Sequence, residues 1–306
     1  MNGNLPIKRS ISHSTAIFQA LFVTFLWSTS WVLIKIGLSG IPALTFAGLR
    51  YGLAFICLLP FLLRPGEMAA LRRLPALAWV RLLALGLLYY TFTQGALFVG
   101  LVHLPAVTVS LLYNFSPIFV ALLGIPLLVE RPSIWQWLGV ALSITGATLY
   151  FYPVALPGGE LIGLVAVAIG VIANAGSSIL GRQINRAGTI PPLGVTAVSM
   201  GFGACVLLSA GIVREGVPAI SLANWAIIAW LALVNTAFAF TLWNHTLRTL
   251  SAVESSVINN TMLIQIAILA WIFLGERLTW QEVAGLIVSG LGVVILQLRS
   301  FSRGFS

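Results

Sequence analysis

The hydrophobic positions of the chain lie in long, nearly uninterrupted blocks, and the polar positions are concentrated in short stretches between them. The apolar blocks include Leu82–Leu88, Ile118–Val129 and Ile264–Leu274, and the breaks carry proline, glycine and arginine. A helix that crosses a membrane needs about 20 apolar residues, and proline and glycine typically end such segments. The pattern therefore predicts ten transmembrane helices, over residues 15–37, 43–63, 79–101, 106–128, 134–152, 160–181, 191–213, 222–244, 252–274 and 280–298.

The composition restricts the fold class in the same direction. Of the 306 residues, 59% are hydrophobic and 8% are charged, and the mean hydropathy is +1.03. A soluble domain carries about 25% charged residues, and a disordered chain has low hydrophobicity, so both classes are excluded. An outer-membrane barrel would show alternating segments of roughly ten residues, which this chain lacks. We therefore predict an all-α integral membrane protein with ten transmembrane helices.

The basic residues lie in alternate loops between the predicted helices. If the N-terminus is cytoplasmic, the cytoplasmic segments hold twelve of them, namely Lys8, Arg9, Arg64, Arg72, Arg73, Arg81, Arg131, Arg182, Arg186, Arg248, Arg299 and Arg303. The opposite loops hold only Arg214 and Arg277. Cytoplasmic loops carry an excess of Lys and Arg, so the net charge of +9 reports orientation rather than a nucleic-acid partner. We predict a multi-pass protein of the cell (inner) membrane with both termini in the cytoplasm.

The second half of the chain repeats the first at an offset of 146 residues. Ser133-Ile-Trp-Gln136 corresponds to Thr279-Trp-Gln-Glu282, and both fit the capping box that begins a helix. A face of small residues also recurs, with Gly139, Ser143 and Gly146 matched by Gly285, Ser289 and Gly292. Such a face lets two helix backbones approach closely, which favours packing inside the molecule and leaves a homodimer contact as the alternative.

Each copy of this repeat would contain five helices, which is an odd number. The two copies must then cross the membrane in opposite directions. We therefore predict two inverted five-helix repeats, residues 1–152 and residues 153–306. Inverted repeats are typical of secondary transporters, in which two similar halves expose one central site to either side in turn.

Several short motifs, in order along the chain, carry a resemblance to a known family. They are Trp27-Ser-Thr-Ser-Trp31 followed by Lys35, then Pro42 and Arg50, then Leu128-Val-Glu130-Arg131, and in the second copy Gly275-Glu276-Arg277. The chain resembles the drug/metabolite transporter (DMT) superfamily, specifically the ten-span EamA-like exporters, and looks similar to the aromatic amino acid exporters among them. The second copy departs from the first, since Leu263 stands where Pro117 would repeat and no arginine mirrors Arg50. The resemblance implies export of small metabolites, often amino acids, through a cavity lined largely by spans three, four, eight and nine, with parts of one and six.

Polar and aromatic residues at the predicted mid-membrane depth are candidates for a substrate site, because polar groups there are costly without a partner or a function. They are Trp27, Ser28, Tyr90, Gln94, Tyr113, Asn114, Asn174, Asn235, Phe238, Asn260 and Gln265. Asn114 and Asn260 are repeat equivalents, so an internal symmetry axis would bring them together. The alternative is that each asparagine only hydrogen-bonds a neighbouring helix. Aromatic side chains in a cavity would suit a flat or apolar substrate.

Four further residues are assigned a structural or coupling role: Lys35, Arg50, Pro117 and Glu254. Pro117 is expected to kink the fourth helix, and Lys35 to extend to the outer interface. Arg50 lies too deep for that, which favours a structural anchor inside the bundle, with binding of a substrate carboxylate as the alternative. The chain has no aspartate and no carboxylate at mid-membrane depth, so we predict a facilitator or an exchanger, or coupling through His103, His245 or Glu254.

No metal-binding or catalytic motif such as HExxH or GxSxG occurs in the sequence, so we predict no cofactor, no metal and no enzyme activity. The predicted function is export of amino acids, aromatic or otherwise neutral, by alternating access, with a small-molecule substrate and the lipid bilayer as partners. A carrier of nucleotide sugars or other phosphorylated metabolites is the alternative among transporters, but it would need several bases around its cavity. A membrane receptor or scaffold that transports nothing is the alternative outside them.

Overall fold

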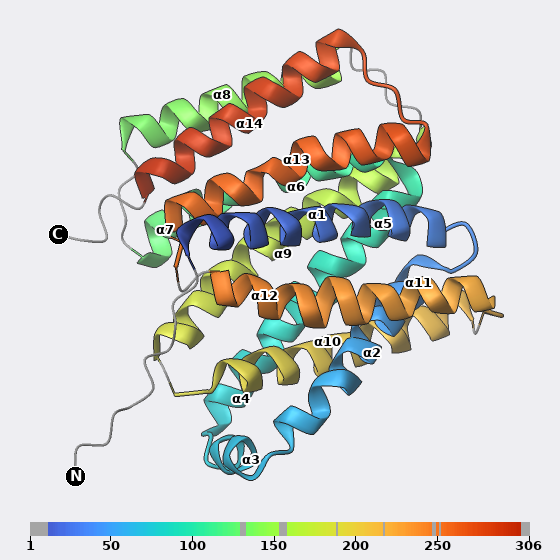
Figure 1. Cartoon of the computed structure of the whole chain (residues 1–306), viewed down its shortest axis with the longest axis vertical. Helices are drawn as coiled ribbons and strands as arrows, with labels where there is room; N and C mark the ends of the chain where they lie inside the picture. Colours follow the sequence, from blue (N-terminus) through green and yellow to red (C-terminus); the bar gives the residue numbers. More distant parts are fainter. Residues whose placement is uncertain are drawn as a thin grey trace.

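The computed structural model describes residues 12–128, 133–152, 158–187, 189–216, 218–246, 249–250 and 252–300. Within these residues every regular element is a helix (Figure 1). The first half contains α1 (His13–Gly37), α2 (Ala43–Leu62), α3 (Pro65–Arg72), α4 (Ala76–Leu85), η1 (Gly86–Gln94), α5 (Gly95–His103), α6 (Ala106–Tyr113), α7 (Ser116–Leu128) and α8 (Ile134–Phe151). The second half contains α9 (Gly158–Ala187), α10 (Pro192–Glu215), α11 (Leu222–Ala232), η2 (Leu233–Phe238), α12 (Ala239–Thr246), α13 (Ala252–Leu274) and α14 (Trp280–Ser300), where η denotes a π-helical segment.

Each of the ten apolar segments predicted from the sequence is mainly helical in the residues that the structure describes, and the fourth is divided into two helices. Five helical stretches there are long and apolar enough to cross a membrane, namely His13–Gly37, Ala43–Leu62, Ala76–His103, Glu160–Asn185 and Pro192–Glu215. Other apolar helices are shorter, at 10–17 residues. The all-helical fold is therefore confirmed, and the length and composition of these helices are those of a multi-pass membrane protein.

The fourth predicted helix is broken where the sequence places Pro117. α6 ends at Tyr113, and the N–H of Asn114 closes its last turn on the carbonyls of Ser110 and Leu111, both at 3.1 Å. α7 then begins at Ser116, so that Pro117 lies in its first turn. Proline is tolerated there because the N–H that it lacks would have no partner within the helix. The predicted kink is confirmed as a complete break between two helices.

The third and eighth predicted helices each contain a π-helical segment in their interior. η1 begins at residue 86 and η2 at residue 233, a separation of 147 residues that nearly equals the repeat offset in the sequence. In each segment a threonine hydroxyl donates to the carbonyl five residues earlier, Thr93 to Leu88 at 2.8 Å and Thr236 to Leu231 at 2.9 Å. π-Helical turns are rare and frequently occur at functional sites. The two segments are therefore the first structural indication of where a site lies.

α8 and α14 pack against each other through the two small-residue faces predicted from the repeat, and they lie side by side along one edge of the bundle (Figure 1). A Cβ added to Gly292 would lie 2.5 Å from the amide nitrogen of Ser143, and one added to Gly285 would lie 2.7 Å from the carbonyl oxygen of Gly146. The hydroxyl of Ser143 donates to the carbonyl of Ser289 at 3.4 Å. Packing of these faces inside the molecule is therefore confirmed.

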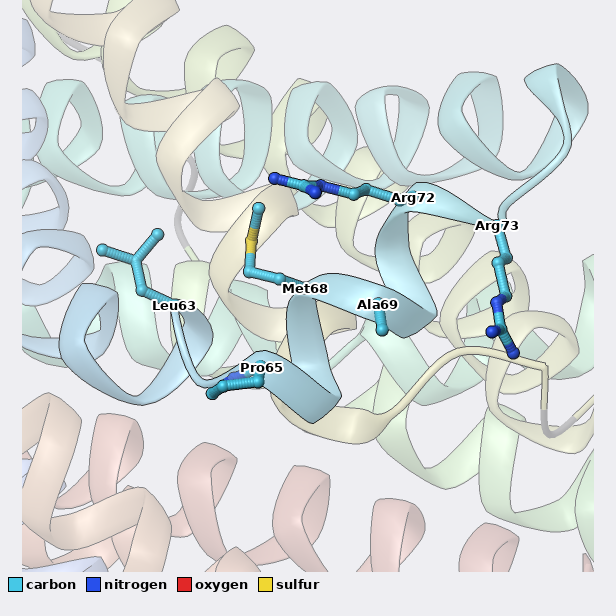
Figure 2. A pocket seen from close by; sticks show the side chains of 6 residues that line it. All are labelled: Leu63, Pro65, Met68, Ala69, Arg72 and Arg73. Carbon is cyan, nitrogen blue, oxygen red and sulfur yellow. The ribbon is translucent and has the colours of Figure 1, made fainter.

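The short helix α3 lies between α2 and α4 and was not expected from the sequence. It has Pro65 at its start, Glu67 in its first turn and Arg72 in its last turn, which is the usual distribution of proline and charge in a helix. A hollow of about 570 Å³ lies beside it. Among the side chains that line this hollow, Arg72 extends toward Met68 while Arg73 points away (Figure 2). The apolar-block analysis missed α3 because it has only eight residues.

The chain connections gather at two opposite ends of the bundle (Figure 1). α1 begins and α14 ends on the side where α3 lies, which we call the α3 end. The α1–α2 loop, the start of α11 and the α13–α14 connection lie on the other side, which we call the α1–α2 end. The fully buried side chains of Phe46 and Phe98 meet edge to face between α2 and α5, with ring centroids 5.1 Å apart.

Candidate functional site

α1 and η2 are joined by polar contacts of two residues that the sequence analysis proposed for the site. Asn235 is fully buried, and its side-chain amide donates to the carbonyl of Leu26 and to the hydroxyl of Ser30, the latter at 2.7 Å. The indole N–H of Trp27 donates to the backbone carbonyl of Asn235 at 3.1 Å. The structure therefore brings Trp27 and Asn235 together, although 208 residues separate them in the sequence.

A second polar contact joins α1 to α13. The hydroxyl of Ser28 lies 2.9 Å from the side-chain oxygen of Gln265 and donates to it. The amide nitrogen of Gln265 donates to the hydroxyls of Thr24 and Thr261, at 3.2 and 3.0 Å. Ser28 is fully buried and Gln265 is half-buried. These two predicted site residues therefore also meet, and α1 is the helix that the two contacts share.

The predicted site residues of α6 and α9 contact residues that lie closer to them in the sequence. The hydroxyl of Tyr113 donates to the carbonyl of Thr93 in η1 at 2.6 Å, and the ring of Tyr113 meets the edge of Trp31 at 6.2 Å between centroids. The side-chain amide of Asn174 donates to the hydroxyl of Ser116 at 3.0 Å. Asn114 donates to the carbonyl of Ser110 in its own helix at 3.2 Å. Tyr113 thus connects α6 to η1.

An arginine and three tyrosines form a cluster between α2 and η1, which we call the arginine–tyrosine cluster; Tyr89 in it is half-buried and the other three are buried. Arg50 is 6% exposed, and its guanidinium carbon lies 5.1 Å from the centroid of the Tyr51 ring. The Tyr51 ring meets that of Tyr90 at 5.3 Å, and Tyr90 meets Tyr89 at 4.9 Å. Tyr89 interacts electrostatically with Arg50 and lies within hydrogen-bonding reach of Gln94. The predicted residues Arg50, Tyr90 and Gln94 therefore belong to one neighbourhood.

Arg50 has no hydrogen bond or ion pair with any residue in the part of the chain that the structure describes. Its Nε atom is buried and has no acceptor. The expectation that Arg50 anchors neighbouring helices through their carbonyls is therefore not met by any contact among those residues. A guanidinium carries five N–H donors, so this cation is short of acceptors while it is almost fully enclosed.

Lys35 differs in this respect from Arg50. Its ammonium group donates to the carbonyls of Leu101 and Leu104 at 2.5 and 2.6 Å, at the C-terminal end of α5. It also interacts electrostatically with Glu276. Lys35 was expected to extend freely to the interface, and instead it is half-buried and fixes α1 to the end of α5.

Two glutamates at the α1–α2 end accept hydrogen bonds from the first amides of distant helices, and the sequence analysis missed this role. Glu276 accepts from the N–H groups of Ala106 and Val107, at 2.7 and 3.2 Å. Glu215 accepts from the N–H groups of Leu44 and Thr45, at 3.3 and 3.1 Å. The signal available in the sequence was the proline before α2 and before α6, because a proline N-cap offers no side-chain acceptor and the first amides of a helix need one.

The remaining predicted residues are not drawn into these contacts. Phe238 is 50% exposed. Asn260 lines an open groove of about 870 Å³ between α13 and α14, together with Trp271 and Arg277. The side chain of Glu254 and the Glu130-Arg131 motif lie outside the described residues. The proposed proximity of Asn114 and Asn260 stays a prediction.

Comparisons with known proteins point to one family. The sequence profile described as "EamA-like transporter family" matches residues 14–152 and again residues 161–298. The Escherichia coli protein described as "Uncharacterized inner membrane transporter YedA" is 29% identical over 248 residues, which cover 77% of this chain and 75% of that protein. The "Probable terminal-alkyne amino-acid exporter" of Streptantibioticus cattleyicolor is 27% identical over 304 residues, covering 95% of this chain and 96% of the exporter.

A solved structure, described only as the crystal structure of a protein, shares the fold. It superposes with a TM-score of 0.66 and covers 96% of this chain and 100% of its own, at 17% sequence identity. At this identity the likeness concerns the arrangement of the helices alone.

Proposed function

The chain belongs to the EamA-like transporter family, and from this premise we propose that it exports amino acids, aromatic or otherwise neutral, by alternating access. The family and the named relatives identify a membrane transporter and not an enzyme. One relative is named as an amino-acid exporter, and it matches the chain along nearly its whole length. The amino-acid substrate of the present chain is our proposal.

The architecture that we propose consists of ten spans in two inverted five-helix repeats, residues 1–152 and residues 153–306. Three observations support it. The family profile matches the chain twice, once in each half. π-Helical segments occur at corresponding places in the two halves, and the small-residue faces of α8 and α14 pack against each other. Two similar halves around one shared site can open that site first to one side and then to the other.

The observation that carries the proposal is a pair of polar and aromatic clusters inside the bundle, one that joins α1 to η2 and α13 and one that joins α2 to η1. Trp27 and Ser28 of α1 contact Asn235 and Gln265. Tyr89 and Tyr90 of η1 lie at the midpoint of the helical stretch Ala76–His103. Transporter sites typically lie at such mid-membrane depth and at interrupted helices. Aromatic walls with amide groups and few charges suit an aromatic or neutral amino acid better than a phosphorylated metabolite.

The orientation follows from charge. The α3 end carries the exposed side chains of Arg64, Arg72 and Arg73 (Figure 2 shows the last two). Cytoplasmic loops are enriched in such residues, and one relative is named as an inner membrane transporter. We place the α3 end, and with it both termini, in the cytoplasm. No acidic residue is available at mid-membrane depth, which favours facilitated diffusion or exchange over proton coupling.

Counterflow in proteoliposomes tests the function. Vesicles that contain the purified protein are loaded with one unlabelled amino acid at a time, and uptake of the labelled amino acid is measured against protein-free vesicles. We expect exchange of at least one aromatic or neutral amino acid and none of nucleotide sugars. Exchange of phosphorylated solutes alone would support the alternative carrier, and exchange of no solute would support a receptor or scaffold.

Cysteine labelling tests the inverted architecture. Cys57 and Cys205 are free thiols and are first replaced by serine. Arg131→Cys and Arg277→Cys are then introduced separately, and a membrane-impermeant maleimide is added to right-side-out and to inverted vesicles. Because the two positions are repeat equivalents, we expect them to react from opposite faces. Labelling of both from the same face would refute the inverted repeat.

A further inference from the structure

The arginine–tyrosine cluster contains a charged side chain, Arg50, that is almost fully buried and has no hydrogen-bond acceptor in the described part of the molecule. Arg50 is seven residues beyond the first residue of α2, or about 10 Å along the helix axis. Its neighbours Tyr89 and Tyr90 lie at the midpoint of a helical stretch that can cross a membrane. The guanidinium therefore belongs to a side chain that is 6% exposed, at a depth where an unpaired charge is costly.

The surrounding residues do not neutralise this cation. Glu215, the last residue of α10, accepts hydrogen bonds from the amides of Leu44 and Thr45 at the start of α2. Thr45 precedes Arg50 by five residues, or about 8 Å of helix. The Tyr51 ring contacts the guanidinium with its face, which is an attractive contact but supplies no lone pair for the five N–H groups. The neighbouring backbone carbonyls are used within helices.

The shape and charge of the Arg50 guanidinium indicate which kind of acceptor it would bind. A guanidinium is planar and always charged, and its paired N–H groups match the two oxygens of a carboxylate. Three tyrosine rings lie in the same cluster, with the Tyr90 ring 5.3 Å from that of Tyr51 and 4.9 Å from that of Tyr89, and aromatic rings favour an apolar or flat group over a polyanion. An isolated arginine also supplies one positive charge, which balances one carboxylate and falls short of a diphosphate.

We propose that the arginine–tyrosine cluster binds the carboxylate of a small organic substrate, with Arg50 holding the two oxygens and Tyr51, Tyr89 and Tyr90 contacting the apolar part. This assignment deepens the proposed amino-acid transport and rests on it for its physiological substrate. The repeat position of Arg50 in the second half is Thr196. The carboxylate subsite is therefore one-sided, so that the substrate enters the pseudo-symmetric bundle in a single orientation.

Three related probes separate the carboxylate from the rest of the ligand. L-Phenylalanine has the carboxylate and the amine, 3-phenylpropionate keeps only the carboxylate, and L-phenylalaninamide keeps only the amine. Binding to the purified full-length protein in nanodiscs is measured by the ligand-induced shift in melting temperature, since a ligand of the folded state raises it. We expect the two carboxylates to bind and the amide to bind at least about tenfold more weakly, because charge-assisted hydrogen bonds are the strong ones.

Variants at Arg50 test whether this residue makes the discrimination. We expect Arg50→Gln to weaken 3-phenylpropionate binding by about tenfold or more, and to leave the affinity for L-phenylalaninamide unchanged. Arg50→Lys keeps the charge without the paired geometry, so it should weaken carboxylate binding less, and it serves as the readout if Arg50→Gln does not fold. Arg64→Gln, at an exposed position beside Phe61, is the matched control and should bind all three probes as the parent does.

The outcomes separate this inference from the proposed function. Equal binding of 3-phenylpropionate by the parent and by Arg50→Gln, or no binding of any carboxylate by the parent at millimolar concentration, would overturn the carboxylate site. Carboxylate binding that depends on Arg50, without counterflow of any amino acid, would leave the site standing and refute amino-acid transport. Counterflow of amino acids that Arg50→Gln and Arg50→Lys leave unchanged would support amino-acid transport and refute the carboxylate site at Arg50.

Discussion

Lys35 and Arg50 are two cations inside predicted spans, and the sequence alone separates them only by their depth. In the structure their surroundings differ completely. Lys35 donates two hydrogen bonds to the end of α5 and lies near the carboxylate of Glu276. Arg50 has a tyrosine ring against it and no acceptor among the described residues. The fold explains a cation whose partners are in place, whereas the enclosed cation without partners is the basis of the proposed carboxylate site.

The difference arises from position along the helices. Lys35 lies in the last turn of α1, beside the end of α5, where the last carbonyls of a helix have no partner of their own. Glu276 meets the first amides of α6 for the corresponding reason. Arg50 lies in the interior of α2, next to helix interiors, where backbone groups are already paired and offer nothing to a cation. The free backbone groups at helix ends can therefore bind charged side chains, whereas the paired backbone groups of helix interiors cannot.

The largest expected effect comes from removing the carboxylate at the α1–α2 end. Glu276→Ala leaves the N–H groups of Ala106 and Val107 without an acceptor and Lys35 without its nearby negative charge. Hydrogen bonds to charged groups contribute about 1.5–3 kcal/mol each, so we expect a loss of roughly 3 kcal/mol. At about 2 °C per kcal/mol, the melting temperature in nanodiscs should fall by about 6 °C.

Glu282→Ala provides the control for that measurement. Glu282 is also a glutamate near a helix start, where it forms the predicted capping box with Thr279 at 2.6–3.2 Å, and these contacts are exposed. A capping residue of this kind contributes about 1 kcal/mol, so its replacement should lower the melting temperature by about 2 °C. Equal losses for the two variants would show that Glu276 has no special role at this end.

The second effect concerns the lysine itself. Lys35→Met keeps most of the side-chain volume and removes both hydrogen bonds to α5, so we expect a loss of about 2 kcal/mol and a melting temperature lower by about 4 °C. Because Lys35 and Glu276 interact, the double variant Lys35→Met/Glu276→Ala should lose less than the sum of the single losses. Strict additivity of the two losses would argue that the groups act independently. The exposed Arg214→Met serves as the control for loss of a positive charge.

Much of the fold could be predicted because it depends on local and periodic features of the sequence. The length of each apolar block determines where a helix can cross the bilayer, Pro117 requires a break in the fourth helix, and the glycines of α8 and α14 form a face without side chains. The π-helical segments could not be predicted in this way. One extra residue in a turn leaves the hydrophobic pattern of a long apolar helix unchanged, and Thr93 and Thr236 looked like ordinary polar residues.

The sequence was enough to propose residues for the candidate site, but not to predict which residues each of them contacts. Trp27, Ser28, Asn235 and Gln265 were recognisable as polar residues at mid-membrane depth. Their pairing depends on which helices become neighbours, and Ser28 and Gln265 are 237 residues apart in the sequence. For the same reason the sequence separated Lys35 and Arg50 by depth alone, and not by the partners that distant segments bring to them.

The smallest expected effect on stability is the one that tests the comparison most directly. Arg50→Met removes a buried cation that makes no hydrogen bond in the described structure, so no partner is orphaned and an unpaired charge leaves the interior. Replacing buried charge by an apolar side chain of similar size is often neutral or stabilising. We therefore expect the melting temperature of Arg50→Met to stay within about 1 °C of the parent, a change of less than about 0.5 kcal/mol, or to rise. Lys35→Met, measured beside it in the same nanodiscs, makes the same chemical change at a satisfied cation and should lose about 4 °C. A comparable loss at Arg50 would mean that the arginine holds the bundle together as Lys35 does, and the carboxylate site would then have no structural basis.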